Sequence, residues 1–381
     1  MNQPPFNLGI LGLGEGVSIL SAAMTTACAE PYLLCDLNED LCKKRAKEYG
    51  LTRYTTSYED MLADPVVDGV AIYTPDPLHG EHVRMALEAG KHVICTKPLF
   101  KGLDEAKAVY DLWRDSRLAV MVGMSCRFFE TFVRQRQMAD EDRHGNLLSV
   151  EAHYNGDKRQ GSSGAWGKAG AVDWLYAGLV HPVDLAYWHL GPIQEVSGFG
   201  MQSPAAKRQG QTTPDTLHFV VKSAAGVVGR ITGCYGAPCE HPDGAPLISC
   251  TLRGDSGVSQ ACYPEFKIHS HFDGSDPATL ICDRHSYYFR WGGTMHHAGE
   301  FQNYLEHFVE SIRARNRPKP DLVDGIRVVA TLDAMKRALA ENRVVSVADE
   351  LERCGLGELA GEESRVNTTQ KALVGPAGRR V

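Results

Sequence analysis

The chain has 381 residues, of which 43% are hydrophobic and 23% charged, and its formal net charge is −7. It is too long for one ordinary hydrophobic core and has the composition of a folded protein, so we expect two domains. The acidic balance argues against nucleic acid or an anionic membrane as the partner, and no apolar run reaches the roughly 20 residues of a membrane helix.

The cysteine pattern and the N-terminal residues predict a cytoplasmic location. Eleven cysteines are scattered along the chain without a Cys-x-x-Cys pair, which favours reduced thiols over disulfides or structural zinc. His241, His296 and His297 lack paired ligand spacing, so we expect no metal site. Residues 1–6 carry no charged flank and no cleavage site; we therefore expect a cytoplasmic chain without a signal peptide.

Strand and helix patterns alternate over the first 123 residues. Such alternation is typical of crossover units that build a parallel sheet, and it predicts a doubly wound Rossmann domain over residues 1–123. The expected strands are 7–11, 31–35, 69–73, 92–95 and 119–122, and the expected helices are 18–29, 39–49, 57–62, 79–89 and 103–114.

The pattern changes after Gly123. Strands at hairpin-like spacing predict an α/β domain with a large, mostly antiparallel open sheet over residues 124–350. From residue 351 glycines break the periodicity, so 351–381 is expected to be a disordered tail, with an arm that docks on another subunit as the alternative. In this second part the expected helices are 130–139, 182–190, 300–314 and 324–342, and the expected strands are 148–154, 196–201, 217–221, 227–235 and 247–253.

A glycine-rich turn follows the first strand. Gly12 permits a tight turn, and Gly14 lets a pyrophosphate approach the backbone at the start of the next helix. The third place of the Gly-x-Gly-x-x-Gly pattern holds Val17, and Gly16 stands one residue early. The pattern predicts that a dinucleotide binds on Gly12, Leu13, Gly14, Glu15, Gly16 and Val17.

An acidic residue ends the second strand. Asp36 follows Gly14 by 22 residues, close to the spacing of the acid that binds the adenine ribose. A carboxylate there accepts hydrogen bonds from ribose hydroxyls and repels a 2′-phosphate, so NAD is expected rather than NADP. The alternative is that Asp36 is only a strand-end or N-cap residue.

Three further motifs follow in order: Tyr73-Thr74-Pro75-Asp76-Pro77-Leu78-His79, then Ala89-Gly90-Lys91-His92-Val93, then Cys95-Thr96-Lys97-Pro98. Together they resemble the Gfo/Idh/MocA oxidoreductases, which include glucose–fructose oxidoreductase and the inositol dehydrogenases. The resemblance implies a Rossmann domain followed by an α/β domain. It also implies that the cofactor is bound by Thr74, Pro75, His79, Thr96 and Lys97.

Lys97 is the first catalytic candidate. The resemblance places it beside the nicotinamide and the substrate, where an ammonium can stabilise the carbinol oxygen as hydride leaves. The alternative is a solvated surface lysine. The family usually has glutamate where this chain has Thr96, so the function of that carboxylate must be absent here or supplied elsewhere.

The second catalytic candidate is His181, which the resemblance implies as the proton acceptor or donor. A reference pKa of about 6.5 suits reversible proton transfer near neutrality. Asp184 lies three residues on and would share a helix face with His181. Where the family often has aspartate this chain has Ala177, and Asp173 is the candidate replacement if the loop is rearranged. The alternative for His181 is a core histidine satisfied by the backbone.

Weaker matches to the same family suggest a set of substrate-binding residues. The alternative is that the aromatic members only pack in the interior and the polar members face solvent on the sheet. The set comprises Arg127, His153, Asn155, Trp166, Asp184 and Tyr235.

The expected function is an NAD-dependent oxidoreductase that transfers hydride between the nicotinamide and a carbinol or keto carbon of a sugar or polyol. One alternative is a glycoside-processing enzyme with tightly bound, internally recycled NAD. Another is a non-catalytic NAD-binding sensor. Because a broad open sheet needs covering, we expect a homodimer or homotetramer.

Overall fold

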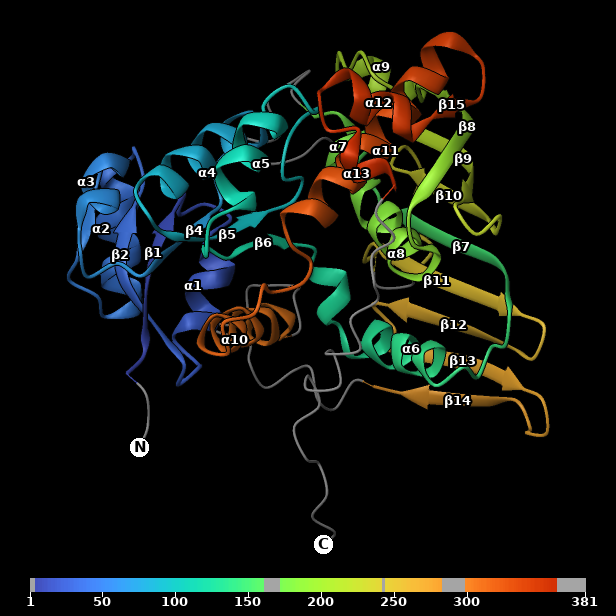
Figure 1. Ribbon diagram of the computed structural model, residues 1–381, viewed down its shortest axis with the longest axis horizontal. Helices are drawn as coiled ribbons and strands as arrows, with labels where there is room; N and C mark the ends of the chain where they lie inside the picture. Colours follow the sequence, from blue (N-terminus) through green and yellow to red (C-terminus); the bar gives the residue numbers. More distant parts are fainter. Residues whose placement is uncertain (1–3, 161–171, 242–243, 283–298, 362–381) are drawn as a thin grey trace, which may run out of the picture.

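The computed structural model describes residues 4–160, 172–241, 244–282 and 299–361, which form two α/β domains side by side (Figure 1). No described helix combines the length and apolarity needed to cross a membrane. None of the eleven cysteines forms a disulfide among the described residues.

The N-terminal domain is a six-stranded parallel sheet in the order β3-β2-β1-β4-β5-β6, as expected of a Rossmann domain. Its central strand β4 is apolar and buried along its whole length because both of its faces are covered. The strands are β1 (Phe6–Leu11), β2 (Ala29–Cys35), β3 (Tyr54–Thr55), β4 (Gly69–Ile72), β5 (His92–Thr96) and β6 (Val120–Gly123). The helices are α1 (Val17–Ala23), α2 (Glu39–Tyr49), α3 (Tyr58–Ala63), η1 (Asp76–Leu78), α4 (His79–Glu88) and α5 (Ala106–Arg114).

Some details differ from the expected elements. The helix expected over residues 18–29 ends at Ala23, because β2 already begins at Ala29 and the chain must turn between them. The two-residue strand β3 was not expected, since two residues carry no periodicity.

The C-terminal domain is built on a nine-stranded sheet in the order β14-β13-β12-β11-β7-β10-β9-β8-β15. The sheet is antiparallel except between β7 and β10. The last strands, β12 to β15, were not expected from the sequence. The strands are β7 (Leu147–Asn155), β8 (Ile193–Met201), β9 (Thr216–Ser223), β10 (Val228–Cys234), β11 (Leu247–Gly254), β12 (Gly257–Tyr263), β13 (Lys267–Phe272), β14 (Ala278–Ile281) and β15 (Val345–Ser346).

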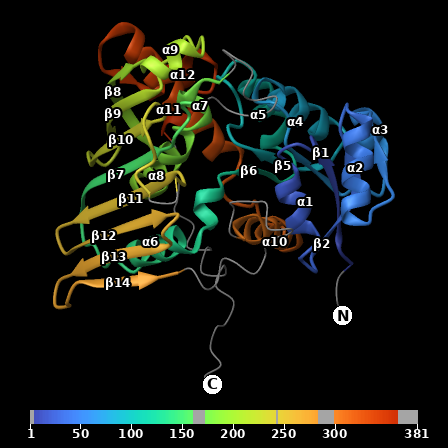
Figure 2. The same cartoon turned by 180° about the vertical axis from the view of Figure 1, so that it is seen from behind.

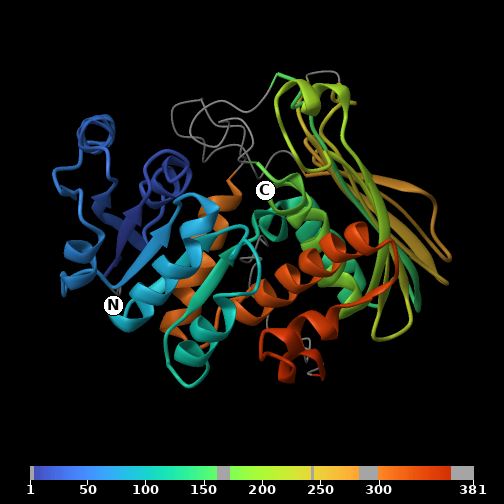
Figure 3. The same ribbon diagram turned by 90° about the horizontal axis from the view of Figure 1, so that it is seen from above.

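Helices cover only the face of this sheet that is turned toward the N-terminal domain (Figure 3). The other face is open in the part of the chain that the structure describes, and apolar side chains such as Phe199 and Val220 project from it. The helices of this domain are η2 (Ser125–Phe128), α6 (Glu130–Asp140), α7 (Trp174–Ala177), α8 (Val180–Leu190), α9 (Pro204–Arg208), α11 (Leu322–Glu341), α12 (Val347–Arg353) and α13 (Glu358–Gly361).

One late helix, α10 (Glu300–Arg313), returns to the N-terminal domain. Its residues Tyr304, Leu305 and Phe308 share a core with β1 and with α1, and α10 lies beside α1 (Figure 2). Residues 300–313 therefore complete the cover of one face of the Rossmann sheet.

The expected disorder from residue 351 is wrong for its first eleven residues. Leu351, Leu356 and Leu359 are buried, and Arg327 on α11 donates to the Leu359 carbonyl oxygen at 2.9 Å. Glycine breaks divide this segment into the short helices α12 and α13, but these leucines anchor it to the core. Residues 362–381 lie outside the described part of the chain.

Candidate active site

The glycine-rich turn joins β1 to α1. Gly12 has a φ of +86°, and a Cβ there would lie 2.6 Å from the Tyr73 carbonyl oxygen. A Cβ on Gly16 would lie 2.2 Å from the Gly12 carbonyl oxygen, so Gly16 provides the close approach that the motif normally assigns one residue later. Gly14 is exposed, with no atom within 4 Å of an added Cβ. This open space above a tight turn fits a bound pyrophosphate.

Asp36 braces the same turn. Its carboxylate accepts hydrogen bonds from the amides of Leu13 at 2.8 Å and Asn38 at 2.9 Å. Asn38, not Asp36, caps α2, so the N-cap alternative for Asp36 is wrong. Asp36 is only half-buried, and its remaining oxygen lone pairs can accept from ribose hydroxyls.

His79 links the second motif to the third. Its ring is fully buried and contacts the carbonyl oxygens of Thr74 at 2.8 Å and Pro98 at 2.6 Å. The Thr74 hydroxyl contacts His82 Nδ1 at 2.9 Å, whereas Pro75 is exposed. His79 thus holds the loop after β4 against the loop that carries Lys97, and cofactor contacts for Thr74, Pro75, His79 and Thr96 stay a prediction.

Lys97 connects the two domains. Its Nζ donates to the carbonyl oxygen of Ala177 at 2.9 Å, and the side chain is half-buried, so the alternative of a solvated surface lysine does not hold. Burial lowers the pKa of Lys97, while the carboxylates of Asp76 and Glu15 act to raise it. One oxygen of Asp76 is buried without a hydrogen-bond partner among the described residues. Asp76 therefore supplies a carboxylate near Lys97, a feature that the sequence analysis missed.

His181 lies in the first turn of α8 and is 9% exposed. Its Nδ1 is 3.4 Å from the Sγ of Cys126, which follows β6. Tyr154 from β7 meets the imidazole edge-on, with ring centroids 5.6 Å apart. Lys97 and Cys126 also lie near each other, so the thiol belongs to the surroundings of both catalytic candidates.

Aromatic rings continue from His181 along this wall. Tyr154 contacts Tyr235 at a centroid distance of 5.4 Å, and Tyr235 stacks on Trp174 at 4.4 Å. The Tyr235 hydroxyl and the Trp174 Nε1 are buried without partners among the described residues. The Tyr235 ring lies against Gly178, where a Cβ would be 2.2 Å from the hydroxyl. Tyr235 is therefore close to His181, and its contact with substrate stays a prediction.

Arg127 and Asp184, both expected to bind substrate, instead bind each other. The Arg127 guanidinium donates three hydrogen bonds to the Asp184 carboxylate at 2.6 to 3.1 Å, and both side chains are almost fully buried. The fork engages the Asp184 carboxylate, so Asp184 is not left free to orient the His181 ring. The prediction missed this pairing because the two residues are 57 positions apart.

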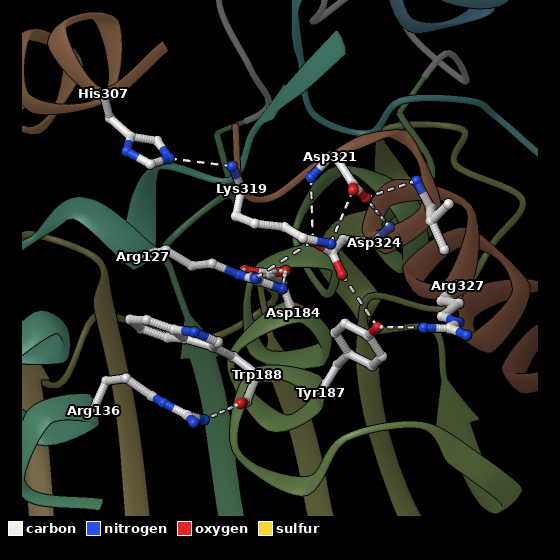
Figure 4. A network of polar contacts seen from close by, with 11 residues as sticks. Arg127, Arg136, Asp184, Tyr187, Trp188, His307, Lys319, Asp321, Asp324 and Arg327 are labelled. Carbon is white, nitrogen blue, oxygen red and sulfur yellow. Dashed lines mark hydrogen bonds and ion pairs between the residues drawn. The ribbon is translucent and has the colours of Figure 1, made fainter. Parts of the chain in front are cut away.

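Figure 4 shows the wider network around this ion pair. Lys319 contacts Asp321 at 2.9 Å and Asp324 at 3.2 Å, and Arg127 reaches Asp324 at 4.0 Å. The Tyr187 hydroxyl donates to Asp324 at 3.2 Å. The network ties η2, α8 and the start of α11 together. It thereby fixes the two segments that carry Cys126 and His181.

The structure does not bring His153 and Asn155 to this site. Val150, Ala152 and Tyr154 face the helices, and side chains alternate along a strand, so His153 and Asn155 point to the open face of the sheet. His153 contacts Ser249 Oγ at 3.2 Å, and the amide of Asn155 donates to Glu240. This geometry gives their expected substrate role no support, and that role stays a prediction; the residue that faces His181 is their neighbour Tyr154.

Two other expectations concern the loop before α8. Asp173 caps α7 by accepting from the Leu175 amide at 3.1 Å, so its carboxylate serves the helix start. Trp166 lies outside the described residues, as do His296 and His297. Among the described residues no group of three or more histidine, cysteine or acidic side chains has the geometry of a metal site.

Comparison with known proteins decides the family. Residues 6–124 match the model described as the oxidoreductase family, NAD-binding Rossmann fold, and residues 136–347 match the model of its C-terminal alpha/beta domain. The chain belongs to the Gfo/Idh/MocA oxidoreductase family. This confirms the resemblance read from the motifs, the NAD-binding Rossmann domain and the α/β partner domain.

Curated proteins that resemble the chain include dehydrogenases named for levoglucosan, xylose and inositols. Levoglucosan dehydrogenase from Pseudarthrobacter phenanthrenivorans is 32% identical over 157 residues, which cover 39% of this chain and 40% of that protein. The scyllo-inositol 2-dehydrogenase (NAD(+)) of Bacillus subtilis is 26% identical over 282 residues, 69% of this chain and 81% of that protein. The match to the first of these thus spans less than half of its length.

A solved structure of levoglucosan dehydrogenase in complex with NADH and L-sorbose has the same fold. The TM-score is 0.80 at 21% sequence identity, with 91% of this chain and 99% of that chain covered. At this identity the likeness concerns the fold of Gfo/Idh/MocA proteins and not the substrate.

Proposed function

We propose that the chain is an NAD-dependent dehydrogenase that oxidises a carbinol carbon of a sugar, a polyol or a sugar derivative, or reduces the corresponding ketone. The observation that carries the proposal is the convergence of Lys97 from the first domain and His181 from the second. Lys97 binds the main chain of Ala177, and Cys126 lies against His181 and near Lys97. A cation and an imidazole so placed are the groups that alcohol–ketone interconversion needs.

The residues divide the chemistry as follows. His181 accepts the hydroxyl proton of the substrate, and the Lys97 ammonium donates a hydrogen bond to the same oxygen as negative charge develops on it. NAD held on the glycine-rich turn and Asp36 would supply the acceptor for the hydride, so the alcohol would lose one hydride and one proton in total. In the reverse direction His181 returns the proton. Burial of Lys97 strengthens its interaction with the oxygen, because less water competes for the ammonium.

Asp36 supports NAD over NADP in this proposal. A carboxylate beside the ribose site repels a 2′-phosphate, and Leu37 and Asn38, the next residues, carry no positive charge. Gly12, Gly14 and Gly16 give the turn its shape, and the amides at the start of α1 supply donors for the pyrophosphate.

The test is NADH fluorescence with NAD supplied, across aldoses, inositols, anhydrosugars and glycosides. A rise with one substrate class that is lost in His181→Ala supports the proposal and names the substrate. Calorimetric binding of NAD without any rise would overturn it. Glycoside cleavage under those conditions would favour an internally recycled cofactor, and no turnover at all would favour a sensor.

A further inference from the structure

We propose that Cys126 is a positioning residue for His181: its sulfur accepts the Nδ1 hydrogen of the imidazole and so leaves Nε2 as the nitrogen that exchanges the substrate proton. The importance of this contact for turnover rests on the proposed function. The tautomer itself does not, and it can be measured without a substrate.

The geometry of the contact is the first support. Cys126 and His181 are 55 residues apart in sequence, yet Sγ and Nδ1 approach to 3.4 Å, a distance at which sulfur takes part in a hydrogen bond. Cys126 is 1% exposed, so water does not replace the thiol as the partner of Nδ1. A neutral imidazole carries one hydrogen. If that hydrogen is on Nδ1 and points at sulfur, Nε2 keeps a lone pair and is able to act as a base.

The second support is the fixed placement of both residues. Arg127 directly follows Cys126, and Asp184 lies one helical turn after His181. The three hydrogen bonds from Arg127 to Asp184 therefore hold the thiol and the imidazole in register. The two backbone segments that carry these groups therefore cannot move apart unless this buried fork also opens.

The charge state of the thiol completes the argument. Burial raises the pKa of Cys126 well above its ordinary value, Asp184 and Glu300 act in the same direction, and Lys97 opposes them. The sulfur is therefore a neutral, weak acceptor. Tyr154 on β7 adds a second neutral group against the ring, because burial raises its pKa to about 12. Neutral neighbours stabilise the imidazolium less than a carboxylate would, which keeps proton transfer reversible.

The experiment uses the full chain with ¹⁵N-labelled histidine, with the His181 signals assigned by their loss in His181→Asn. We expect the wild type to show neutral His181 with its hydrogen on Nδ1. Cys126→Ser should keep this tautomer, since a hydroxyl oxygen also accepts, whereas Cys126→Ala should give a mixture. Cys250→Ala, which removes another fully buried thiol, should leave the His181 signals unchanged.

Kinetics supply the second readout. Cys126→Ala should lower kcat about tenfold with little change in NAD binding. The acid limb of its pH profile should move to lower pH, because the imidazolium loses an acceptor for its Nδ1 hydrogen. Cys126→Ser should recover most of kcat, a rescue that a purely packing role would not produce.

A wild-type hydrogen on Nε2, or a Cys126→Ala variant with unchanged tautomer and unchanged kcat, would overturn the inference. A chain that oxidises no member of the substrate panel while His181 keeps its hydrogen on Nδ1 would count against the proposed function alone. In that case the tautomer assignment still stands, so the two failures are distinguishable.

Discussion

The Lys97 ammonium donates a 2.9 Å hydrogen bond to the carbonyl oxygen of Ala177, which joins the end of β5 in one domain to the end of α7 in the other. Ala177 occupies the position where the family often has aspartate, and its main chain rather than its side chain contacts Lys97. The hydrogen bond that positions Lys97 therefore does not require an acidic side chain at residue 177. What Ala177 changes is the set of polar groups that remain for the substrate.

Replacing Lys97 should lower the rate of catalysis without weakening cofactor binding. Lys97→Ala should lower kcat by about 100-fold or more, because the oxygen loses its cationic partner, while NAD binding stays largely intact. NADH formation and calorimetry measure the two effects. Lys107→Ala on the exposed face of α5 is the matched control and should change neither. Full activity in Lys97→Ala would remove Lys97 from the mechanism.

Two glycines of the cofactor turn should respond differently to alanine. Gly16→Ala places a Cβ 2.2 Å from the Gly12 carbonyl oxygen and should lower the free energy of unfolding by about 1–3 kcal/mol. Gly14→Ala meets no atom within 4 Å, so its thermal stability without NAD should match the wild type while its NAD affinity falls. Unfolding curves and calorimetry on both variants test this contrast, which an equal effect on stability would refute.

Removing one partner of the buried Arg127–Asp184 ion pair should strongly destabilise the fold. Asp184→Asn leaves Arg127 without its carboxylate in the interior and should lower the free energy of unfolding by about 3–5 kcal/mol. Asp157→Asn removes a pair of the same length, 2.6 Å to Arg159, but at the surface and outside this network, and should cost far less. Urea unfolding compares the two. Similar losses would show that the network in Figure 4 contributes no more than a surface pair.

The pH dependence of turnover should reveal the effect of the Asp76 carboxylate on Lys97. Burial lowers the pKa of Lys97 and Asp76 raises it, so Asp76→Asn should lower that pKa further. If turnover needs the protonated ammonium, activity is lost as pH rises through the pKa of Lys97. The basic limb of the pH profile should accordingly move to lower pH in Asp76→Asn. The control is Asp115→Asn at an exposed site, which should leave the basic limb of the pH profile unchanged. An unchanged basic limb in Asp76→Asn would show that Asp76 does not act on Lys97.

The open sheet face should mediate self-association. Phe199, Met201, Val220 and Val228 are each at least 50% exposed and lie on one face of neighbouring strands, so a homodimer or homotetramer would cover them. Light scattering should show a dimer or tetramer for the wild type and a smaller species for Phe199→Glu. Leu112→Glu on α5 introduces the same charge at an exposed apolar site elsewhere and should keep the wild-type mass. A monomeric wild type would refute the prediction.

The parts of the fold that follow from local pattern could be read from the sequence. The Rossmann domain, α2 at its full length and most strands of the second sheet have clear periodicity. Strands β12 to β15 were not recognised, and the packing of Leu351, Leu356 and Leu359 was hidden because it depends on distant partners. The motifs located Lys97 and His181, but pairings across 55 or more residues were beyond sequence reasoning.

Two pairs in the predicted substrate set have surroundings that were not expected, for different reasons. Asp184 and Arg127 were assigned to substrate because nothing local reveals that they neutralise each other. His153 and Asn155 were assigned to the wrong side of a correctly expected strand. There the alternation of the apolar residues Val150 and Ala152 already carried the information that Tyr154, and not its neighbours, faces the helices.

The return of α10 to the first domain has a consequence for biosynthesis. While the ribosome makes the middle of the chain, the first domain has all six of its strands but lacks Tyr304, Leu305 and Phe308 to cover one face. Nearly 180 residues are translated between β6 and α10. During that interval the nascent cofactor domain exposes an apolar surface, so it should depend on a chaperone or on slow compaction until α10 emerges.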